Sequence, residues 1–470
     1  MFKYLVNYAN NNKISFHMPG HKGSGIYKMY GYESFVQSIM DCDITEITGA
    51  DNLFQPEGII KEVQDAYERL YEVKKSFLLV NGTTAGILAS VMASVAPGKK
   101  LLMSRGCHKS VYDAVKLGSI EPVYVQPQQY RDEGIIGVID PVDVEKALQE
   151  DPDIDAVILP SPNYYGICSD VEAISEIVHR YNKILIIDQA HGAHLKFFHK
   201  FGVGQRIPKA AEDCGADIVI NSIHKTLASY TQSAVLNVVS DRVDIYNLFE
   251  KLQMVQSTSP SYILMASLAI NAEIIEKHGE VLFGKWKKSL EWFYENASEI
   301  QGLHLIKGEE LDPTKINIDL SAWGITGKEV EEFLMNKMHF ELCTGDVLMA
   351  MTGIGNKQEH FLVLLDGLNR AIDEIGCEEL GLRRGNGFEV PPSGLQMPHG
   401  TEKEEIFLKD SEGRVCASNI TPYPPGIPFS CEGEEITGEI VNSLQRLIDE
   451  GHMVCGVTEE NKVCVYKGEK

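Results

Sequence analysis

The amino-acid sequence predicts an α/β fold in which a mostly parallel β-sheet carries helices on both faces. Short, almost wholly apolar segments alternate with amphipathic helical segments between residues 58 and 239. A strand that is apolar at nearly every position is buried on both of its faces, which is the environment of a parallel sheet. We expect strands at residues 77–80, 100–103, 121–125, 156–159, 184–187, 217–220 and 234–239.

The first expected helix precedes this sheet. Apolar residues recur three and four positions apart at Ile60, Val63, Ala66, Tyr67 and Leu70, which is the period of one helix face. A further amphipathic helix is expected between two strands, at residues 170–181. Beyond the sheet, the sequence predicts helices at residues 260–292, 328–338 and 361–375 and a strand at 315–320.

These elements predict four successive segments. Residues 1–56 are irregular and rich in Gly, Asn, His and acidic groups, and we interpret them as an N-terminal arm. We expect a large α/β domain at 57–265, a smaller α+β domain at 266–382, and a C-terminal α+β domain at 383–470. Residues 383–398 are rich in Gly and Pro, so they are expected to form a linker.

Composition excludes several classes of protein. The 470 residues are 44% hydrophobic and 23% charged, and 67 acidic against 43 basic residues give a formal net charge of −24. That balance disfavours nucleic acid and anionic membranes as partners and suits a small cationic ligand. We find no apolar run of the ~18 residues that a membrane helix needs. The N-terminal residues do not resemble a signal peptide, and the ten scattered cysteines are typical of reduced thiols in a cytoplasmic protein.

Polar clusters follow three of the expected strands. Asp188 ends strand 184–187, Lys225 follows strand 217–220 within Asn221-Ser222-Ile223-His224-Lys225-Thr226, and Asn81-Gly82-Thr83-Thr84 follows strand 77–80. In an open α/β sheet, ligands bind at the carboxyl ends of the strands. We therefore expect these clusters to meet at one site.

Each cluster suits one part of pyridoxal phosphate. The Gly82-Thr83-Thr84 turn would hold the phosphate at a helix N-terminus. Lys225 would form the Schiff base, and Asp188 would keep the pyridine nitrogen protonated. Taken singly, such residues are more often a helix cap, a solvated lysine and a turn residue, so it is their joint placement that favours a cofactor site. Asp188, His191 and His194 also resemble metal ligands, but nothing nearby completes a zinc site, and no metal is expected.

Several longer motifs resemble the prokaryotic ornithine/lysine/arginine decarboxylase family in its short form, which lacks an N-terminal wing domain. They are Asp188-x-Ala190-His191-Gly192-Ala193-His194, Ser222-x-His224-Lys225-Thr226, Cys107-His108-Lys109-Ser110, the arm motif at residues 17–23 and the Pro-rich run at 422–428. The resemblance implies a fold-type I pyridoxal-phosphate enzyme that is a homodimer or a larger homo-oligomer. Its active sites would lie between subunits.

The resemblance also assigns roles to the matching positions. Lys225 would be the Schiff-base lysine and Asp188 the partner of the pyridine nitrogen. His108 would stack on the cofactor ring, and His191 would lie near the ring and its phenolic oxygen. The phosphate would be held by Thr83, Thr84, Ser222 and His224.

The arm contains a segment, Asp41-Cys42-Asp43-Ile44-Thr45-Glu46, that resembles an acidic stretch of the family. A carboxylate can bind a guanidinium at two points. We hypothesise that the arm reaches the neighbouring subunit's site, where Asp43 or Glu46 would recognise the distal cation of the substrate. The alternative is that these acids cap a turn or face solvent.

The implied activity is decarboxylation of a basic amino acid, with arginine converted to agmatine and carbon dioxide for polyamine synthesis. The alternatives are lysine or ornithine as substrate, an aminotransferase or lyase on the same fold, and a non-catalytic regulatory relative. Three positions depart from the family pattern. Gln189 stands where the family usually has Glu, and Asn163 stands where it usually has Thr. The third departure is the segment 430–434.

Overall fold

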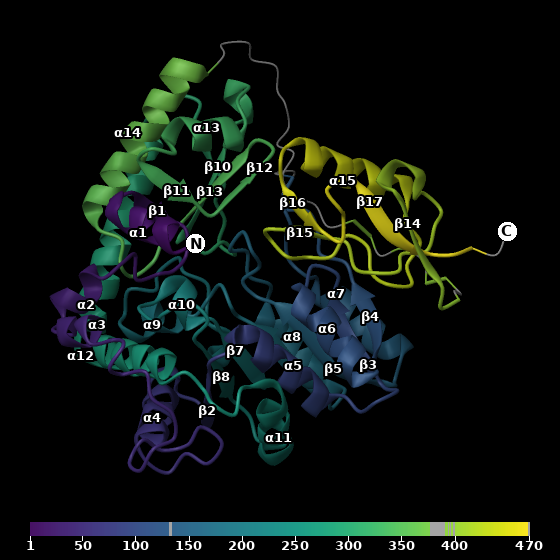
Figure 1. Ribbon diagram of the computed structural model, residues 1–470, viewed down its shortest axis with the longest axis horizontal. Helices are drawn as coiled ribbons and strands as arrows, with labels where there is room; N and C mark the ends of the chain where they lie inside the picture. The colour runs from purple at the N-terminus through teal and green to yellow at the C-terminus, as the bar shows by residue number, and fades with distance from the viewer. Residues whose placement is uncertain (131–133, 377–390, 393, 395, 398–399, 469–470) are drawn as a thin grey trace.

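The computed structural model describes residues 1–130, 134–376, 391–392, 394, 396–397 and 400–468. Figure 1 shows the large sheet and its helices in the lower half of the view, a second unit with a small sheet at the upper left, and the yellow C-terminal unit at the upper right. Most of the predicted linker at 383–398 lies outside the described residues.

The largest sheet in the described residues has seven strands in the order β2-β8-β7-β6-β5-β3-β4. Its strands are β2 (Lys75–Leu79), β3 (Lys100–Ser104), β4 (Glu121–Val125), β5 (Ile154–Pro160), β6 (Ile184–Asp188), β7 (Ile218–Asn221) and β8 (Ala234–Val238). Neighbouring strands from β4 to β7 are parallel. The predicted α/β class with a mostly parallel sheet is confirmed.

Strand β8 is the exception, because it pairs antiparallel with both β2 and β7. The sheet is therefore mostly parallel, as predicted, with one antiparallel strand. Between β7 and β8 the chain forms only the one-turn helix α10 (Ile223–Thr226). A parallel crossover needs a helix that spans the sheet, so the chain turns back alongside β7 instead.

Helices cover both faces of this sheet (Figure 1). They are α4 (Ile59–Tyr71), α5 (Gly82–Ser94), α6 (Lys109–Gly118), α7 (Pro141–Glu150), α8 (Val171–Arg180), α9 (Leu195–Lys200), η1 (Ala211–Asp213) and α11 (Ile245–Val255). In β3, Leu101 and Met103 pack with α5, α6 and α11, whereas Leu102 packs with α7 and α8. Alternate side chains point to opposite faces, so burial of both sets explains the continuous apolar sequence.

The order of the strands places a topological switch point between β3 and β5. The chain runs outward from β3 to β4, then returns through β5, β6 and β7 on the other side of β3. The connections after β3 and β5 therefore diverge, which opens a crevice at the carboxyl ends of these strands.

A second unit is built from helices around a four-stranded antiparallel sheet of order β12-β13-β10-β9. Its elements are α12 (Tyr262–Ala297), β9 (His304–Leu305), β10 (Lys315–Asp319), η2 (Ser321–Trp323), α13 (Gly327–Leu334), β11 (Met338–Phe340), β12 (Leu342–Thr344), β13 (Val347–Met351) and α14 (Gln358–Ile375). Helix α12 runs through the predicted boundary at 265/266. The four segment boundaries remain a prediction.

The C-terminal unit consists of two short antiparallel pairs, β14–β17 and β15–β16, with one helix. Its elements are β14 (Lys403–Phe407), η3 (Leu408–Asp410), β15 (Thr421–Tyr423), α15 (Gly438–Asp449), β16 (Met453–Cys455) and β17 (Lys462–Tyr466). The Pro-rich run begins in β15, on the side of this unit that faces the large sheet.

The arm is more ordered than the sequence predicts. Residues 1–56 contain α1 (Phe2–Asn10), β1 (Ile14–Phe16), α2 (Gly25–Met29) and α3 (Glu33–Gln37), so the expectation of an irregular segment was wrong. Strand β1 pairs in parallel with β11. The predicted helix at 328–338 ends at Leu334 for the same reason, since Met338 pairs with Ile14 of the arm. Pairing between distant segments overrides the local pattern.

No described helix combines the length and the apolar character needed to cross a membrane. The cysteines in the described part of the chain are all free.

Gly20 packs the arm against the turn that contains Lys225. Its N–H donates to the carbonyl of His224 (2.7 Å), and its carbonyl accepts from the N–H of Gly355 (3.0 Å). A Cβ at Gly20 would lie 2.2 Å from the carbonyl carbon of Thr226. The arm and the loop after β13 can therefore approach this turn only because residue 20 has no side chain.

We expect Gly20→Ala to lower the free energy of unfolding by about 1–3 kcal/mol, because the methyl group meets backbone atoms that cannot rotate away. Chemical denaturation measures this change. The matched control is Gly25→Ala at the start of α2, where an added Cβ meets nothing within 4 Å. Equal stability of the two variants would contradict the close packing of the arm.

Candidate functional site

A cavity of about 460 Å³ lies at the carboxyl ends of the parallel strands, beside the β3/β5 switch point. It is lined by residues that follow β2, β3, β5, β6 and β7, by the arm and by the Pro-rich run. All eight residues assigned to the cofactor line this one cavity, namely Thr83, Thr84, His108, Asp188, His191, Ser222, His224 and Lys225.

Lys225 lies in the single turn of α10, directly after β7. Its Nζ is 2.9 Å from Nε2 of His191. Burial lowers the pKa of Lys225 to about 8, although Asp188 and Glu341 oppose the shift, and nearby Lys315 adds to it. Burial also lowers the pKa of His191 well below its usual range. The imidazole is therefore neutral, and its Nε2 can accept a hydrogen bond from the lysine.

Asp188 ends β6 on the same side of the sheet. Its Oδ1 accepts a hydrogen bond from the N–H of Ala190 (3.1 Å). Burial raises the pKa of Asp188, while the positive charge of Lys225 and the Ala190 N–H act in the opposite direction. The structure thus provides one buried carboxylate that favours a protonated partner nearby.

The turn after β2 has the geometry expected of an anion site. Gly82 opens the 13-residue helix α5 with a φ of +68°, and its N–H donates to the carbonyl of Gln232 (2.8 Å). The hydroxyl of Ser222 donates to Oγ1 of Thr83 (3.3 Å), which brings the ends of β2 and β7 together. Hydroxyl groups at the N-terminus of a helix favour a phosphate group.

His224 lies beside this anion site. Its Nδ1 donates to the carbonyl of Ser233 (2.9 Å), since a carbonyl can only accept. Burial lowers the pKa of His224 to about 4, so the ring is neutral and its Nε2 can accept a hydrogen bond.

His108 caps the N-terminus of α6 with its own ring. Its Nδ1 accepts from the N–H of Ser110 (3.3 Å), and burial lowers its pKa to about 3 with help from Lys225 and Lys109. The Pro-rich run packs against the ring. The carbonyl of Gly426 accepts from the N–H of Lys109 (2.8 Å), and a Cβ on Gly426 would lie 3.0 Å from His108 Cδ2. The Ser110 N–H and the Pro-rich run thus restrict the orientation of the His108 ring.

Arg105 holds the Pro-rich run in place. Its guanidinium is fully buried and donates to the carbonyls of Pro428 (2.6 Å) and Phe429 (2.9 Å) and to the hydroxyl of Tyr112 (2.8 Å). Oε2 of Glu434 lies 3.4 Å from the same group. The C-terminal unit is therefore bound to the loop after β3, next to His108.

Among the cavity residues to which sequence reasoning assigned no role are Glu341, His17 and Tyr164. Glu341 connects β11 to β12 and accepts hydrogen bonds from Tyr164 OH (2.8 Å) and the N–H of Met18 (3.0 Å), with His17 Nδ1 at 2.7 Å. Burial alone would raise the pKa of Glu341, but these donors lower it overall. A lone Glu between apolar residues in a strand region was the available signal.

Asp43 and Glu46 do not line the cavity of their own chain. Asp43 is exposed, and Glu46 borders a separate surface hollow. Whether they reach a neighbouring subunit's site stays a prediction. His194 also points away from Asp188, because its Nε2 contacts Asp312 (3.0 Å). Within the described residues, no group of three or more His, Cys, Asp or Glu side chains could hold a metal ion.

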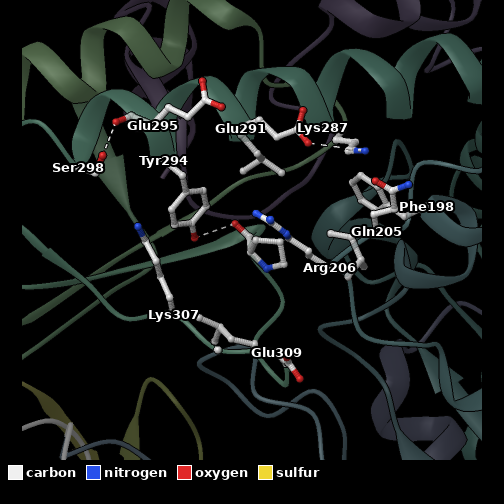
Figure 2. A pocket seen from close by; sticks show the side chains of 15 residues that line it. Phe198, Gln205, Arg206, Lys287, Glu291, Tyr294, Glu295, Ser298, Lys307 and Glu309 are labelled. Atoms are coloured by element: carbon white, nitrogen blue, oxygen red, sulfur yellow. Dashed lines mark hydrogen bonds and ion pairs between the residues drawn. The ribbon is translucent and has the colours of Figure 1, made fainter.

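A larger cavity of about 1160 Å³ lies against α12, away from the strand ends (Figure 2). It contains none of the residues assigned to the cofactor. Three of its charged groups have local contacts, as Lys287 is paired with Glu291 (3.7 Å) and Lys307 lies over the ring of Tyr294 (5.5 Å). We assign the chemistry to the smaller cavity, because that is where a lysine of lowered pKa meets buried carboxylates.

Comparisons with known proteins show the family to which the chain belongs. The model of the Orn/Lys/Arg decarboxylase major domain matches residues 1–313, and that of the family's C-terminal domain matches residues 391–464. The uncharacterised protein YaaO of Bacillus subtilis is 32% identical over 99% of this chain and 98% of its own length. An arginine decarboxylase of the same organism is 29% identical over 97% of this chain and 95% of its own length.

Among solved structures, the constitutive lysine decarboxylase of Escherichia coli superposes with a TM-score of 0.74 at 20% identity, covering 99% of this chain and 81% of that one. This likeness confirms the predicted fold-type I architecture. The major-domain model alone matches more than half of the chain, and the C-terminal model follows in the expected order. The chain therefore belongs to the Orn/Lys/Arg decarboxylase family.

Proposed function

We propose that this chain is a pyridoxal-phosphate-dependent decarboxylase that converts arginine to agmatine and carbon dioxide. The observation that carries the proposal is the meeting of Lys225, Asp188 and the anion site of α5 in one cavity. The arginine decarboxylase similarity over nearly the whole chain favours arginine over lysine and ornithine. Cytoplasmic location and a contribution to polyamine synthesis belong to the same proposal.

The residues present fit the cofactor. Lys225 would hold its aldehyde carbon, Asp188 its pyridine nitrogen and His108 one face of its ring. The N-terminus of α5 would hold its phosphate, together with Thr83, Thr84, Ser222 and His224. Nδ1 of His191 is buried and lacks a hydrogen-bond partner among the described residues, as expected of a donor that awaits an acceptor on a ligand.

When bound, the cofactor supplies an electron-accepting ring that stabilises the negative charge left on Cα after carbon dioxide departs. The chain's own residues prepare this chemistry. A pKa of about 8 leaves part of the Lys225 amine unprotonated near neutral pH, as attack on an aldehyde requires. His191 lies within 2.9 Å of that amine and can exchange a proton with it.

The charges around the cavity favour a cationic substrate. Among the described lining residues, Lys225 is the single lysine or arginine, whereas Asp188 and Glu341 supply carboxylates. The hydrogen bonds from Tyr164 and Met18 keep Glu341 ionised. A buried carboxylate attracts a guanidinium or ammonium group strongly, because screening by water is weak there.

We further propose that the active unit is a homodimer or a larger homo-oligomer with sites between subunits. Apolar side chains of the arm are exposed, among them Phe2 (78% exposed), Met40 (79%) and Ile47 (59%). Exposed apolar groups that gather on one segment are typical of a surface that a partner covers. Asp43 and Glu46 belong to the same segment, so the arm would bring them to a neighbouring site.

Purified protein supplied with pyridoxal phosphate should release carbon dioxide and an amine from arginine faster than from lysine or ornithine. Lys225→Ala should abolish turnover while leaving the far-ultraviolet circular dichroism unchanged. Borohydride reduction followed by mass spectrometry should place the cofactor on Lys225. A keto acid as product would indicate an aminotransferase, and a reduced cofactor on another lysine would contradict the assignment.

Asp188→Asn should still bind the cofactor but lose at least about tenfold in kcat, with a smaller change in KM. An amide cannot hold the pyridine proton as a carboxylate does, and charge-assisted hydrogen bonds are roughly twice as strong as neutral ones. The loss appears where negative charge develops. Steady-state kinetics with arginine measure it, and near-normal turnover would show that Asp188 is only a turn residue.

Neutralising the arm carboxylate that binds the distal cation should lower kcat/KM for arginine by about 10²- to 10³-fold. The reason is that the guanidinium of the substrate would then be buried without a partner of opposite charge. The variants are Asp43→Asn and Glu46→Gln. Mixing the damaged variant with Lys225→Ala should restore activity, because one mixed site then has an intact arm and an intact lysine. If both variants lose less than about threefold, the substrate is recognised elsewhere. Damage without restoration would place the arm in its own subunit's site.

A further inference from the structure

Gln189, one of the departures from the family pattern, is fully buried next to Asp188. Its Nε2 donates to Oε2 of Glu212 (2.8 Å) and to Oδ1 of Asn221 (3.0 Å). Its Oε1 accepts from the N–H of Ala211 (2.7 Å). Every hydrogen-bonding atom of this amide is therefore in use, and none of its partners is in the cavity.

Glu212 is the centre of this cluster. Its Oε1 accepts from Nδ2 of Asn221 (2.8 Å) and Nδ2 of Asn237 (2.9 Å), while its Oε2 accepts from Gln189. Among the described residues, no lysine or arginine forms an ion pair with it. Glu212 is thus held by three amide groups instead of a cation. Burial raises the pKa of its carboxyl, and the hydrogen bonds from Asn237, Gln189 and Asn221 oppose this shift.

The backbone fixes the direction of these bonds. The Ala211 N–H can only donate, so the side-chain atom of residue 189 that faces it must be an acceptor. The other end of that side chain faces Glu212 and Asn221, and there the Gln189 amide supplies its two hydrogens. A Glu at position 189 would place a second carboxylate oxygen against the first.

The cluster joins the two strands that carry the catalytic groups. Gln189 follows Asp188 at the end of β6, and Asn221 precedes Ser222 at the end of β7. Gln189 also lies against Gly192, where a Cβ would be 2.8 Å from its Cγ, so it supports the turn that leads to His191. Asn237 extends the cluster to β8 and, through the Ser76 hydroxyl (2.8 Å), to β2.

We propose that Gln189 and Glu212 are a positioning pair whose single negative charge, held between β6 and β7, sets the placement of Asp188 and Ser222 for cofactor binding. The pair requires one carboxylate and one amide. Which of the two positions carries the carboxylate matters less than their sum, because the two side chains contact each other directly (2.8 Å) and share Asn221 as a partner. The effect on cofactor binding rests on the function proposed above, whereas the charge requirement does not.

The test exchanges the two side chains. Gln189→Glu adds a second carboxylate and Glu212→Gln removes the first, so each single variant should bind pyridoxal phosphate at least about tenfold more weakly. The double variant Gln189→Glu/Glu212→Gln restores one carboxylate and one amide. It should regain cofactor binding to within about threefold of wild type. It should also recover the absorbance spectrum of the bound cofactor, whereas a rescue of stability alone would leave that spectrum changed.

The cofactor-free protein supplies a second readout. In Gln189→Glu two carboxyls must share one proton, so one pKa is raised in the folded state. The thermal midpoint of this variant should approach that of wild type below the unfolded-state pKa of Glu, about 4.3, and fall as the pH rises above it, since the unfolded state loses the proton first. The double variant should follow wild type. Other titratable groups near the pair include Asp188, Tyr71 of α4 and Cys214 after η1, and none of them is changed.

Gln64→Glu on α4 is the matched control. Gln64 is also buried, but it lies two helical turns before Tyr71, the α4 residue that is near Glu212. Its loss of stability should not be repaired by Glu212→Gln. A double exchange that loses as much as the two single variants combined would overturn the proposal, as would a Gln189→Glu variant with wild-type stability at every pH. If Gln189→Glu does not fold, cofactor binding and stability of the double variant still test the proposal. If wild type binds no cofactor, the function fails while the thermal midpoints still test the pair.

Discussion

Burial of the Lys225 amine is the constraint on which the rest of the site depends. An ammonium group is stable in water and costly in a dry cavity. The cavity walls compensate for this with the carboxylates of Asp188 and Glu341, while burial keeps the surrounding imidazoles of His108, His191 and His224 neutral. The resulting pKa of about 8 makes the amine a base near neutral pH. A more open site would leave Lys225 protonated and inert.

Closing this cavity requires segments from both ends of the chain. The arm supplies His17 and Met18, and the Pro-rich run supplies Tyr423 and Pro424. Each is fixed by contacts that do not involve the cavity. Gly20 packs against the Lys225 turn, and Arg105 binds the carbonyls that follow the Pro-rich run. The sheet therefore positions the reacting groups, and the two ends of the chain exclude water from them.

The strand pattern predicted the large sheet and the convergence of its polar ends. The carboxyl ends of parallel strands lie at one edge, so Asp188 and Lys225 had to be neighbours. The reversal of β8 could not be foreseen, since an apolar strand looks the same in either direction. Glu341 escaped prediction for a different reason. It reaches the cavity through the packing of a second unit on the first, and its three donors come from the arm and from the segment after β5.

The sequence also could not explain why Gln is tolerated beside Asp188, because the answer lies at Glu212, far along the chain and on another element. The two residues meet only when η1 packs beneath the ends of β6 and β7. Their contact separates two tasks at the strand ends. The carboxylate of Asp188 faces the cavity and remains available to a ligand. The carboxylate oxygens of Glu212, in contrast, already accept hydrogen bonds from Gln189, Asn221 and Asn237. At the anion site, hydroxyl groups and a helix N-terminus would stabilise a negative charge in place of lysine or arginine. That arrangement leaves Lys225 as the cavity's one strong cationic group among the described residues, free to react with a carbonyl instead of pairing with a phosphate.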